Sequence, residues 1–224
     1  MSRQNVFWIL MATWVAAPTM VMFLCAGRSG AQNSSADYTF LVGSGFLCDH
    51  GAAGTCPAVA KSANGDRYQM SGAGTFNTPG KSVTAAGSFS HESANGVVLE
   101  TGVWLANELV RFDSYGVAPG ALLSGGLAFG RAPGGPRRLP VAGGFVPTGG
   151  LAVFRIRLLP VLGAVKIAVL EVNCALGDAP AGRSTEGIRL TFGKTGTGFS
   201  EEGSGRVMFL TMRTETSEAA KPPK

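Results

Sequence analysis

Charged side chains and histidines are scarce in this sequence of 224 residues. Asp, Glu, Lys and Arg make up only 15% of the chain, hydrophobic residues make up 45%, and there are two histidines. This composition excludes intrinsic disorder, which requires low hydrophobicity and high net charge. Long segments without glycine or proline are also lacking, which excludes a coiled coil or a helical bundle. The glycines do not follow the three-residue period of collagen.

Glycine and proline are abundant instead, with 33 and 12 residues. They separate short runs rich in β-branched and aromatic residues, and amphipathic helices between these runs are lacking. In Phe154–Leu158 apolar side chains alternate with Arg155 and Arg157, as in a half-buried antiparallel strand. The sequence therefore predicts an all-β fold, an antiparallel sandwich or barrel of about 8–10 short strands.

Several local patterns give more specific expectations. Asn95-Gly96 is the strongest hairpin signal in the chain, and Gly72-Ala73-Gly74 is interpreted as a turn. Residues 97–112 fit a helical face as well as a strand, and the β-branched residues favour a long or bulged strand. Residues 165–174 are almost continuously apolar, which predicts a strand covered on both faces.

The first 31 residues have the pattern of a secretory signal peptide. Residues 6–25 carry no charge, Arg3 precedes them, and Ser29-Gly30-Ala31 offers small side chains at a cleavage site. Pro18 interrupts the apolar run and favours cleavage, although the run is long enough to remain as an uncleaved anchor. We expect a secreted or periplasmic protein of the bacterial cell envelope, with no other membrane-associated segment.

One domain is predicted after the signal peptide, over residues 32–213. Within it, residues 116–150 are rich in glycine and proline and are interpreted as a long flap. Residues 214–224 are polar and are expected to form a disordered tail. Removing Arg3 and Arg28 with the signal leaves 17 basic and 14 acidic groups, a charge of +3. So small a charge does not indicate a nucleic-acid partner.

Cysteine usage is the best chemical clue. Cys48 and Cys56 flank a short, glycine-containing loop, and an exported protein forms disulfides by default. A Cys48–Cys56 disulfide is therefore predicted, with Cys174 left as a buried thiol. Pairing of Cys174 with either of the other two stays open, since sequence does not fix connectivity. A metal site of these three cysteines with His50 is a further alternative, but the spacing is wider than in structural zinc sites.

Few residues qualify for catalysis, and we expect no catalytic, cofactor-binding or metal-binding site. His91 lies beside Ser90, yet neighbours in a strand face opposite sides, and no G-x-S-x-G motif occurs. His91 is thus interpreted as a solvent-facing histidine before the Asn95-Gly96 turn. Glu171 interrupts an apolar run, so it is either tuned in a pocket or paired with Arg155, Arg157 or Arg189.

The flap carries three arginines, Arg131, Arg137 and Arg138. They are candidates for contact with an anionic polysaccharide or lipid headgroup, and three scattered arginines are more often simply solvated.

Four stretches resemble small exported bacterial β-rich proteins of unassigned function. They are Gly72–Phe76, Gly87–His91, Gly102–Trp104 and Glu186–Leu190. The resemblance covers most of the chain after the signal and includes no catalytic motif. It implies export and a β architecture only.

Three functions remain, of which the first is favoured. The first is a non-catalytic binding or structural β domain, whose partner is unknown and could be a component of the envelope. The second is a calycin-like barrel with an apolar small ligand, lined by the 13 phenylalanines. The third is a cell-envelope hydrolase that uses Glu171 or His91.

Overall fold

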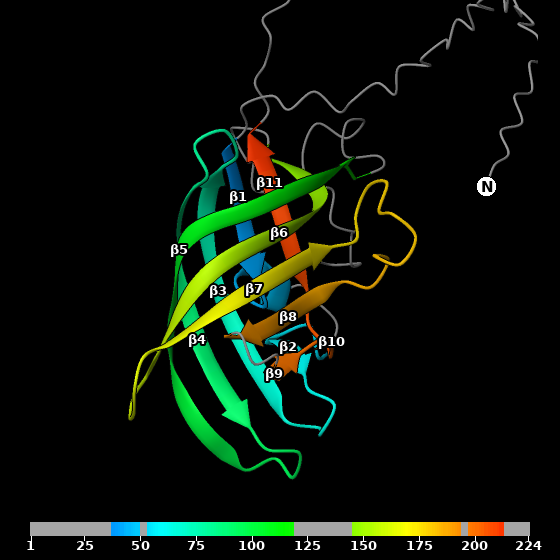
Figure 1. The fold of residues 1–224 in the computed structure, drawn as a ribbon. Coiled ribbons are helices and arrows are strands. Elements are labelled where there is room, and N and C mark those ends of the chain that lie inside the picture. Colours follow the sequence, from blue (N-terminus) through cyan, green and yellow to red (C-terminus); the bar gives the residue numbers. More distant parts are fainter. Residues whose placement is uncertain (1–36, 50–52, 119–144, 194–196, 213–224) are drawn as a thin grey trace, which may run out of the picture. The chain divides into compact units, whose positions relative to one another are not determined.

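A computed structural model describes residues 37–49, 53–118, 145–193 and 197–212, and these residues form a domain of antiparallel strands (Figure 1). A four-residue helix, α1 (Phe46–Asp49), follows the first strand. The strands are β1 (Asp37–Val42), β2 (Ala58–Lys61), β3 (Arg67–Asn77), β4 (Ser82–Glu92), β5 (Val98–Val117), β6 (Phe145–Pro160), β7 (Lys166–Cys174), β8 (Gly187–Phe192), β9 (Thr197–Phe199), β10 (Glu201–Glu202) and β11 (Val207–Met212). The all-β prediction is confirmed.

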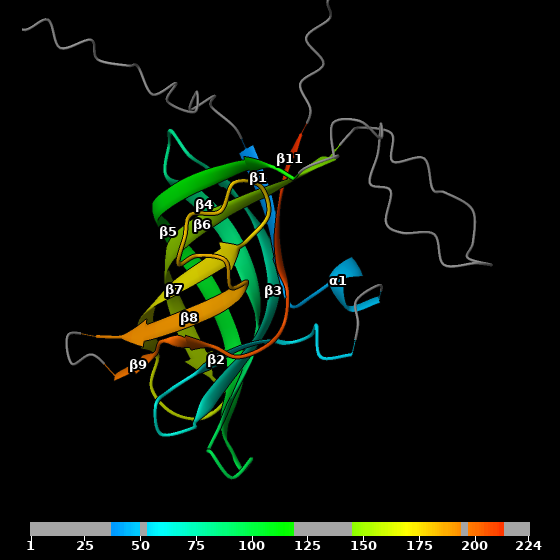
Figure 2. The same ribbon diagram turned by 90° about the vertical axis from the view of Figure 1, so that its right-hand side faces the viewer.

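Six of the strands close into a ring. Hydrogen-bonded pairing runs from β3 through β1, β11, β6, β5 and β4 and back to β3. Beyond the reach of β1 and β11, the long strands β3 and β6 pair instead with β2 and β7, and β8 continues from β7 to lie against β2. The strands therefore curl around one interior, as Figure 2 shows, in a barrel rather than two separate sheets.

The two ends of this barrel differ. β1 begins and β11 ends at one end, where Tyr38 pairs with Thr211. The β2–β3, β4–β5 and β6–β7 turns lie at the other, which we call the hairpin end (Figures 1 and 2). The Asn95-Gly96 turn is confirmed there, with Gly96 at φ +79° and its N–H donating to the carbonyl of Ser93.

The predicted long or bulged strand is confirmed as β5. It runs over 20 residues, and its pairing with β6 shifts between Ala106 and Glu108, between Leu109 and Arg111, and between Ser114 and Gly116. Such bulges increase the local bend and twist of a strand. They let one strand cross the wall of the barrel from end to end.

The turn expected at Gly72-Ala73-Gly74 is wrong, because β3 continues through these residues. Glycine is needed there for space. A Cβ on Gly72 would lie 2.4 Å from Cζ2 of Trp104, and one on Gly87 would lie 2.5 Å from Nε1 of the same indole. The two glycines of neighbouring strands thus make room for the largest fully buried side chain of the described core, Trp104.

Aromatic rings fill the interior toward the end where β1 begins. Phe40 stacks on Phe154 with ring centroids 4.7 Å apart, and Phe76 packs edge-on against Phe154 and Phe209. Tyr38 stacks on Phe76 at 5.1 Å. This cluster provides much of the apolar burial that stabilises the fold.

The structure corrects the expectations for β7 and for the flap. β7 is not covered on both faces, because Ile167 on its outer side is 53% exposed while Leu170 on its inner side is buried. The two ends of the predicted flap 116–150 are strand, since β5 reaches Val117 and β6 begins at Phe145. Residues 119–144 lie outside the described residues, as do the predicted signal peptide and tail.

Candidate functional site

A polar cluster lies inside the barrel at the hairpin end. It consists of Tyr68 on β3, His91 on β4, Glu100 on β5 and Lys166 on β7. The register places Tyr68 opposite His91 and His91 opposite Glu100, so three adjacent strands present these side chains in one row. Inward-facing neighbours on the same strands, such as Phe89 and Trp104, belong to the core.

Glu100 is the centre of this cluster. Nζ of Lys166 lies 2.6 and 2.7 Å from its two carboxylate oxygens, and the hydroxyl of Tyr68 donates to Oε1 at 2.5 Å. Nδ1 of His91 lies 3.6 Å from Oε1, and the imidazole stacks on the Tyr68 ring at 4.4 Å. Nε2 of His91 is buried without a hydrogen-bond partner among the described residues.

The protonation states follow from these contacts. Burial lowers the pKa of His91, although the negative charge of Glu100 opposes this, so the imidazole is neutral at pH 7. Burial by itself would raise the pKa of Glu100, but hydrogen bonds from Lys166 and Tyr68 outweigh it and hold the pKa below its ordinary value. Burial and the neighbouring carboxylate both raise the pKa of Tyr68. The cluster therefore contains one charged pair and two neutral rings.

His91 is not the solvent-facing turn residue that the sequence suggested. It belongs to β4, and its ring also meets Phe199 edge-on at 5.6 Å. The hydroxyl of Ser90 is on the other side of the strand, so these neighbours do not form a base and nucleophile pair. Tyr68 and Lys166 satisfy the carboxylate of Glu100, and these contacts join β3, β5 and β7, while Nε2 of His91 remains unsatisfied among the described residues.

The outer face of β5, β6 and β7 changes from polar to apolar toward the hairpin end. The pairing places five successive rows of outward side chains across these strands. From the far end, the rows are Asp113–Leu151–Asn173, then Arg111–Val153–Glu171, then Glu108–Arg155–Val169, then Leu105–Arg157–Ile167, and finally Val103–Leu159.

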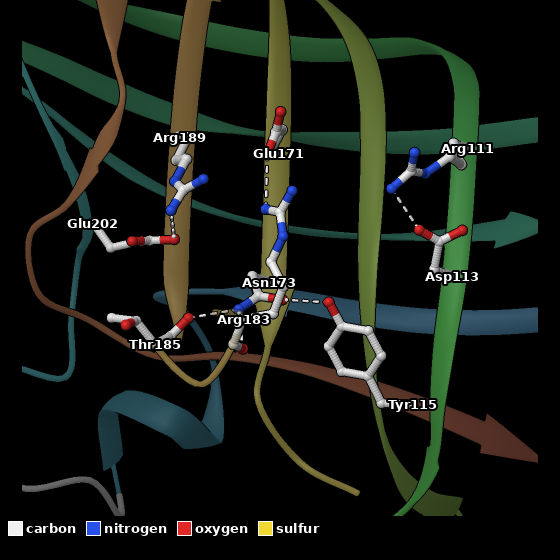
Figure 3. A network of polar contacts seen from close by, with 9 residues as sticks. All are labelled: Arg111, Asp113, Tyr115, Glu171, Asn173, Arg183, Thr185, Arg189 and Glu202. Carbon is white, nitrogen blue, oxygen red and sulfur yellow. Dashed lines mark hydrogen bonds and ion pairs between the residues drawn. The ribbon is translucent and has the colours of Figure 1, made fainter. Parts of the chain in front are cut away.

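The first rows lie under the connection from β7 to β8, residues 175–186. Asn173 is 3% exposed, accepts a hydrogen bond from Tyr115 at 2.9 Å and donates to the carbonyls of Arg183 and Thr185 (Figure 3). Asp178 donates its N–H to the carbonyl of Tyr115. This connection covers that part of the face and satisfies its polar groups.

Glu171 belongs to the same network. Its carboxylate lies 3.4 Å from Nη1 of Arg183, and Arg189 pairs instead with Glu202 at 2.9 Å (Figure 3). Glu171 thus has an arginine partner, but it is none of the expected Arg155, Arg157 and Arg189. Arg155 pairs with Glu108 instead. Sequence pattern could not identify Arg183, since it lies in an irregular connection.

The last two rows are uncovered and, apart from Arg157, aliphatic. Val103, Leu105 and Ile167 are exposed on the strands, and Val161 and Leu162 in the β6–β7 turn are 76% and 85% exposed. Every large exposed hydrophobic residue among the described residues belongs to β5, to the residue before it or to the β6–β7 hairpin; they are Val97, Val98, Leu99, Val103, Leu105, Val110, Val117, Val161, Leu162, Val165 and Ile167. Apolar side chains gathered in this way make these strands a candidate interaction surface. We call residues 97–99, 103, 105, 161, 162, 165 and 167 the aliphatic surface.

The three described cysteines, Cys48, Cys56 and Cys174, belong to neither feature. The predicted Cys48–Cys56 disulfide is confirmed, with Cα atoms 5.5 Å apart, so the pairings with Cys174 are wrong. Disulfide sulfurs are not thiolate ligands, which removes both from the alternative metal site. Cys174 is a buried free thiol, and burial raises its pKa to about 11. A disulfide fits an oxidising, extracytoplasmic environment.

His50, Arg131, Arg137 and Arg138 lie outside the described residues. Within the four described ranges, no group of His, Cys, Asp and Glu side chains is arranged to hold a metal ion. In the same ranges, no helix has the length and apolar character required to cross a bilayer. No protein-family model, curated protein or solved structure matches this chain.

Sequence reasoning missed Tyr68 and Lys166 as the partners of Glu100. A usable signal was present. The Asn95-Gly96 turn brings the end of β4 beside the start of β5, and the two-residue alternation puts His91 on the side of Phe89 and Glu100 on the side of Trp104. The charge-free segment 158–165 was a similar signal for the β6–β7 part of the aliphatic surface.

Proposed function

We propose that this chain is an exported, non-catalytic binding domain of the cell envelope that acts through the aliphatic surface. The observation that supports this function is the contrast along one face of the barrel. The β7–β8 connection covers one half of the face and satisfies its polar groups, while the other half presents Val103, Leu105 and Ile167 to solvent. Exposing such side chains without a partner costs solubility.

The proposed export accounts for two other features. The charge-free segment 6–25 followed by Ser29-Gly30-Ala31 is the pattern of a cleaved signal, and the Cys48–Cys56 disulfide is compatible with oxidising conditions. A periplasmic or secreted location supplies those conditions. The mature chain would begin at Gln32.

An outer binding surface fits the packing better than an interior ligand. Stacked rings of Tyr38, Phe40, Phe76 and Phe154 occupy the interior toward one end, and the Glu100 cluster occupies the other. Among the described phenylalanines, five that could have lined a calycin-like cavity pack against one another; they are Phe40, Phe76, Phe112, Phe154 and Phe209. The apolar ligand or partner is therefore assigned to the outside of β5, β6 and β7.

The test measures surface binding and export in the same preparation. The chain is expressed in a bacterial host, recovered from the periplasm or medium, and titrated with a fluorescent apolar probe. The double variant L105D/I167D is expected to lose most of the probe signal. The matched variant V110D/V117D changes two exposed valines elsewhere on β5 and is expected to retain it.

Three results would contradict the proposal. They are equal probe binding by both double variants, retention of the chain in the cytoplasm, and turnover on a panel of ester and glycoside substrates. N-terminal sequencing of the recovered protein checks the cleavage site directly.

A further inference from the structure

We propose that the partner of the aliphatic surface is a lipid bilayer with anionic headgroups, into which the β6–β7 hairpin inserts its turn. This inference rests on the proposed function and names its partner. The turn is the most exposed apolar element of the described domain, with Leu162 at 85% and Val161 at 76%. Val165 on the returning side of the same hairpin is also exposed.

The shape of this element favours a fluid partner. In a surface strand that packs on a flat protein partner, one side of the strand is apolar and the other is polar. Here Val161, Leu162 and Val165 are consecutive or nearly so and are all exposed around a turn at Gly163, whose φ is +106°. Acyl chains can surround such a tip on all sides, and a preformed protein surface contacts only one of them.

The residue types point the same way. All the large exposed hydrophobic residues among those described are valine, leucine or isoleucine. The cores of protein interfaces are enriched in Tyr, Trp, Phe, Met and Arg, which provide most of the binding energy. An aliphatic tip without these anchors matches transfer into hydrocarbon, where free energy follows apolar area.

The charges next to the tip complement an anionic headgroup layer. The segment 158–165 has no charged residue, and a cation flanks it on each side, Arg157 and Lys166. Lys166 neutralises Glu100 through contacts of 2.6 and 2.7 Å. Arg157 is exposed and has no ion pair within the described part of the chain, so its charge is free for a phosphate.

The second hairpin at this end supports the same orientation. Val97, Val98 and Leu99 follow the β4–β5 turn and are more than half exposed. The backbone N–H of Val161 donates to the carbonyl of Thr101 at 2.8 Å, which ties the start of the β6–β7 turn to β5 in the other hairpin. Both turns point away from the end where β1 begins and β11 ends (Figures 1 and 2). The chain can therefore meet a bilayer with its hairpin end while the described ends of the domain face away from it.

The experiment is flotation of the exported protein with vesicles of phosphatidylcholine alone and of phosphatidylcholine with one quarter phosphatidylglycerol. Wild type is expected to float with both, and more strongly with the anionic vesicles. L162D is expected to reduce binding at least about tenfold, since a charge replaces the inserted leucine. The control V110D, on β5 away from the two turns and outside the aliphatic surface, is expected to bind as wild type. R157Q is expected to reduce the preference for anionic vesicles about fivefold.

A fluorescence measurement reports insertion itself. Tryptophan in L162W is expected to shift to shorter wavelength and to be quenched by brominated acyl chains, whereas tryptophan in V110W is not. The buried Trp104 gives a constant background in both variants.

Each outcome decides the inference. It is overturned if wild type does not float, if L162D floats as wild type, or if the tryptophan of L162W is not quenched. A second outcome is that wild type does not float but binds the apolar probe, and that L105D/I167D loses probe binding. The proposed binding surface would then stand, and its partner would be a protein. Failure of both would remove the proposed function as well.

Discussion

Lys166 on β7 holds both carboxylate oxygens of Glu100 on β5, although β6 lies between these two strands in the sheet. The pair therefore bridges the wall of the barrel at the base of the two exposed hairpins. Glu100 is largely buried and Lys166 is partly exposed. A carboxylate in that position is stable in its charged form only while a donor remains beside it.

Replacing Lys166 should for this reason destabilise the fold. We expect K166M to lower the free energy of unfolding by about 1–2 kcal/mol at pH 7, because a buried charged acceptor loses its strongest donor. Urea denaturation measures the change. The control K61M removes an exposed lysine that has no ion pair in the described ranges, and should be close to neutral. Combining K166M with E100Q should recover part of the loss; additive effects would contradict direct coupling.

The pH dependence of stability should report on His91. Burial lowers its pKa in the folded state below the ordinary 6.5, so the unfolded chain binds more protons as the pH falls through that value. Stability should therefore decrease as the solution is acidified below about pH 6.5. Glu100, whose pKa is also lowered, adds a further loss below about pH 4.5.

The variant H91F keeps a ring on Tyr68 and removes the titrating group. We expect its stability to change less between about pH 7 and pH 5 than that of wild type. Unfolding midpoints in urea over this range provide the measurement, and H50Q serves as the control for the other histidine. The groups that face His91 are Tyr68, Glu100 and Lys166, with Asp66 acting at longer range. If H91F kept the wild-type change of stability with pH, the effect would belong to the carboxylates among these groups and not to His91.

Local patterns in the sequence predicted the strands, the Asn95-Gly96 hairpin and the Cys48–Cys56 disulfide because each depends on neighbouring residues. The outward arginines of β6 were equally visible from two-residue alternation. The partners Glu100–Lys166 and Glu171–Arg183 were not, since they join residues 66 and 12 positions apart through the closure of the barrel and through an irregular connection. Sequence alternation assigns a side of a strand, and only the register assigns a neighbour.

Glycines inside strands were the clearest error of local reasoning. Gly72 indicates a turn by composition, yet in the fold it lies beneath an indole that approaches from β5. No pattern within β3 contains that information, because Trp104 is 32 positions away in the chain. The same physical requirement makes a sharp prediction for the glycine on the neighbouring strand.

We expect G87A to destabilise the domain by about 2–4 kcal/mol, in the range of severe overpacking. Its Cβ would lie 1.9 Å from the carbonyl oxygen of Ser71 and 2.5 Å from Nε1 of Trp104, whose N–H donates to that same carbonyl. Urea denaturation and the emission of Trp104 measure the loss. The control G80A alters an exposed turn glycine and should cost well under half as much; similar losses would contradict the steric account.

The disulfide should contribute stability mainly by constraining the unfolded chain. It closes a loop with a sequence separation of 8, for which the entropic account gives about 2–3 kcal/mol. We expect the double variant C48S/C56S to lose that amount in urea denaturation. Reduced wild type should match the variant, and oxidised C174S should retain the disulfide contribution.

Cys174 is fully buried with a raised pKa, so it should react with a thiol reagent only after unfolding. Fast labelling of Cys174 in the native protein would contradict its place in the core.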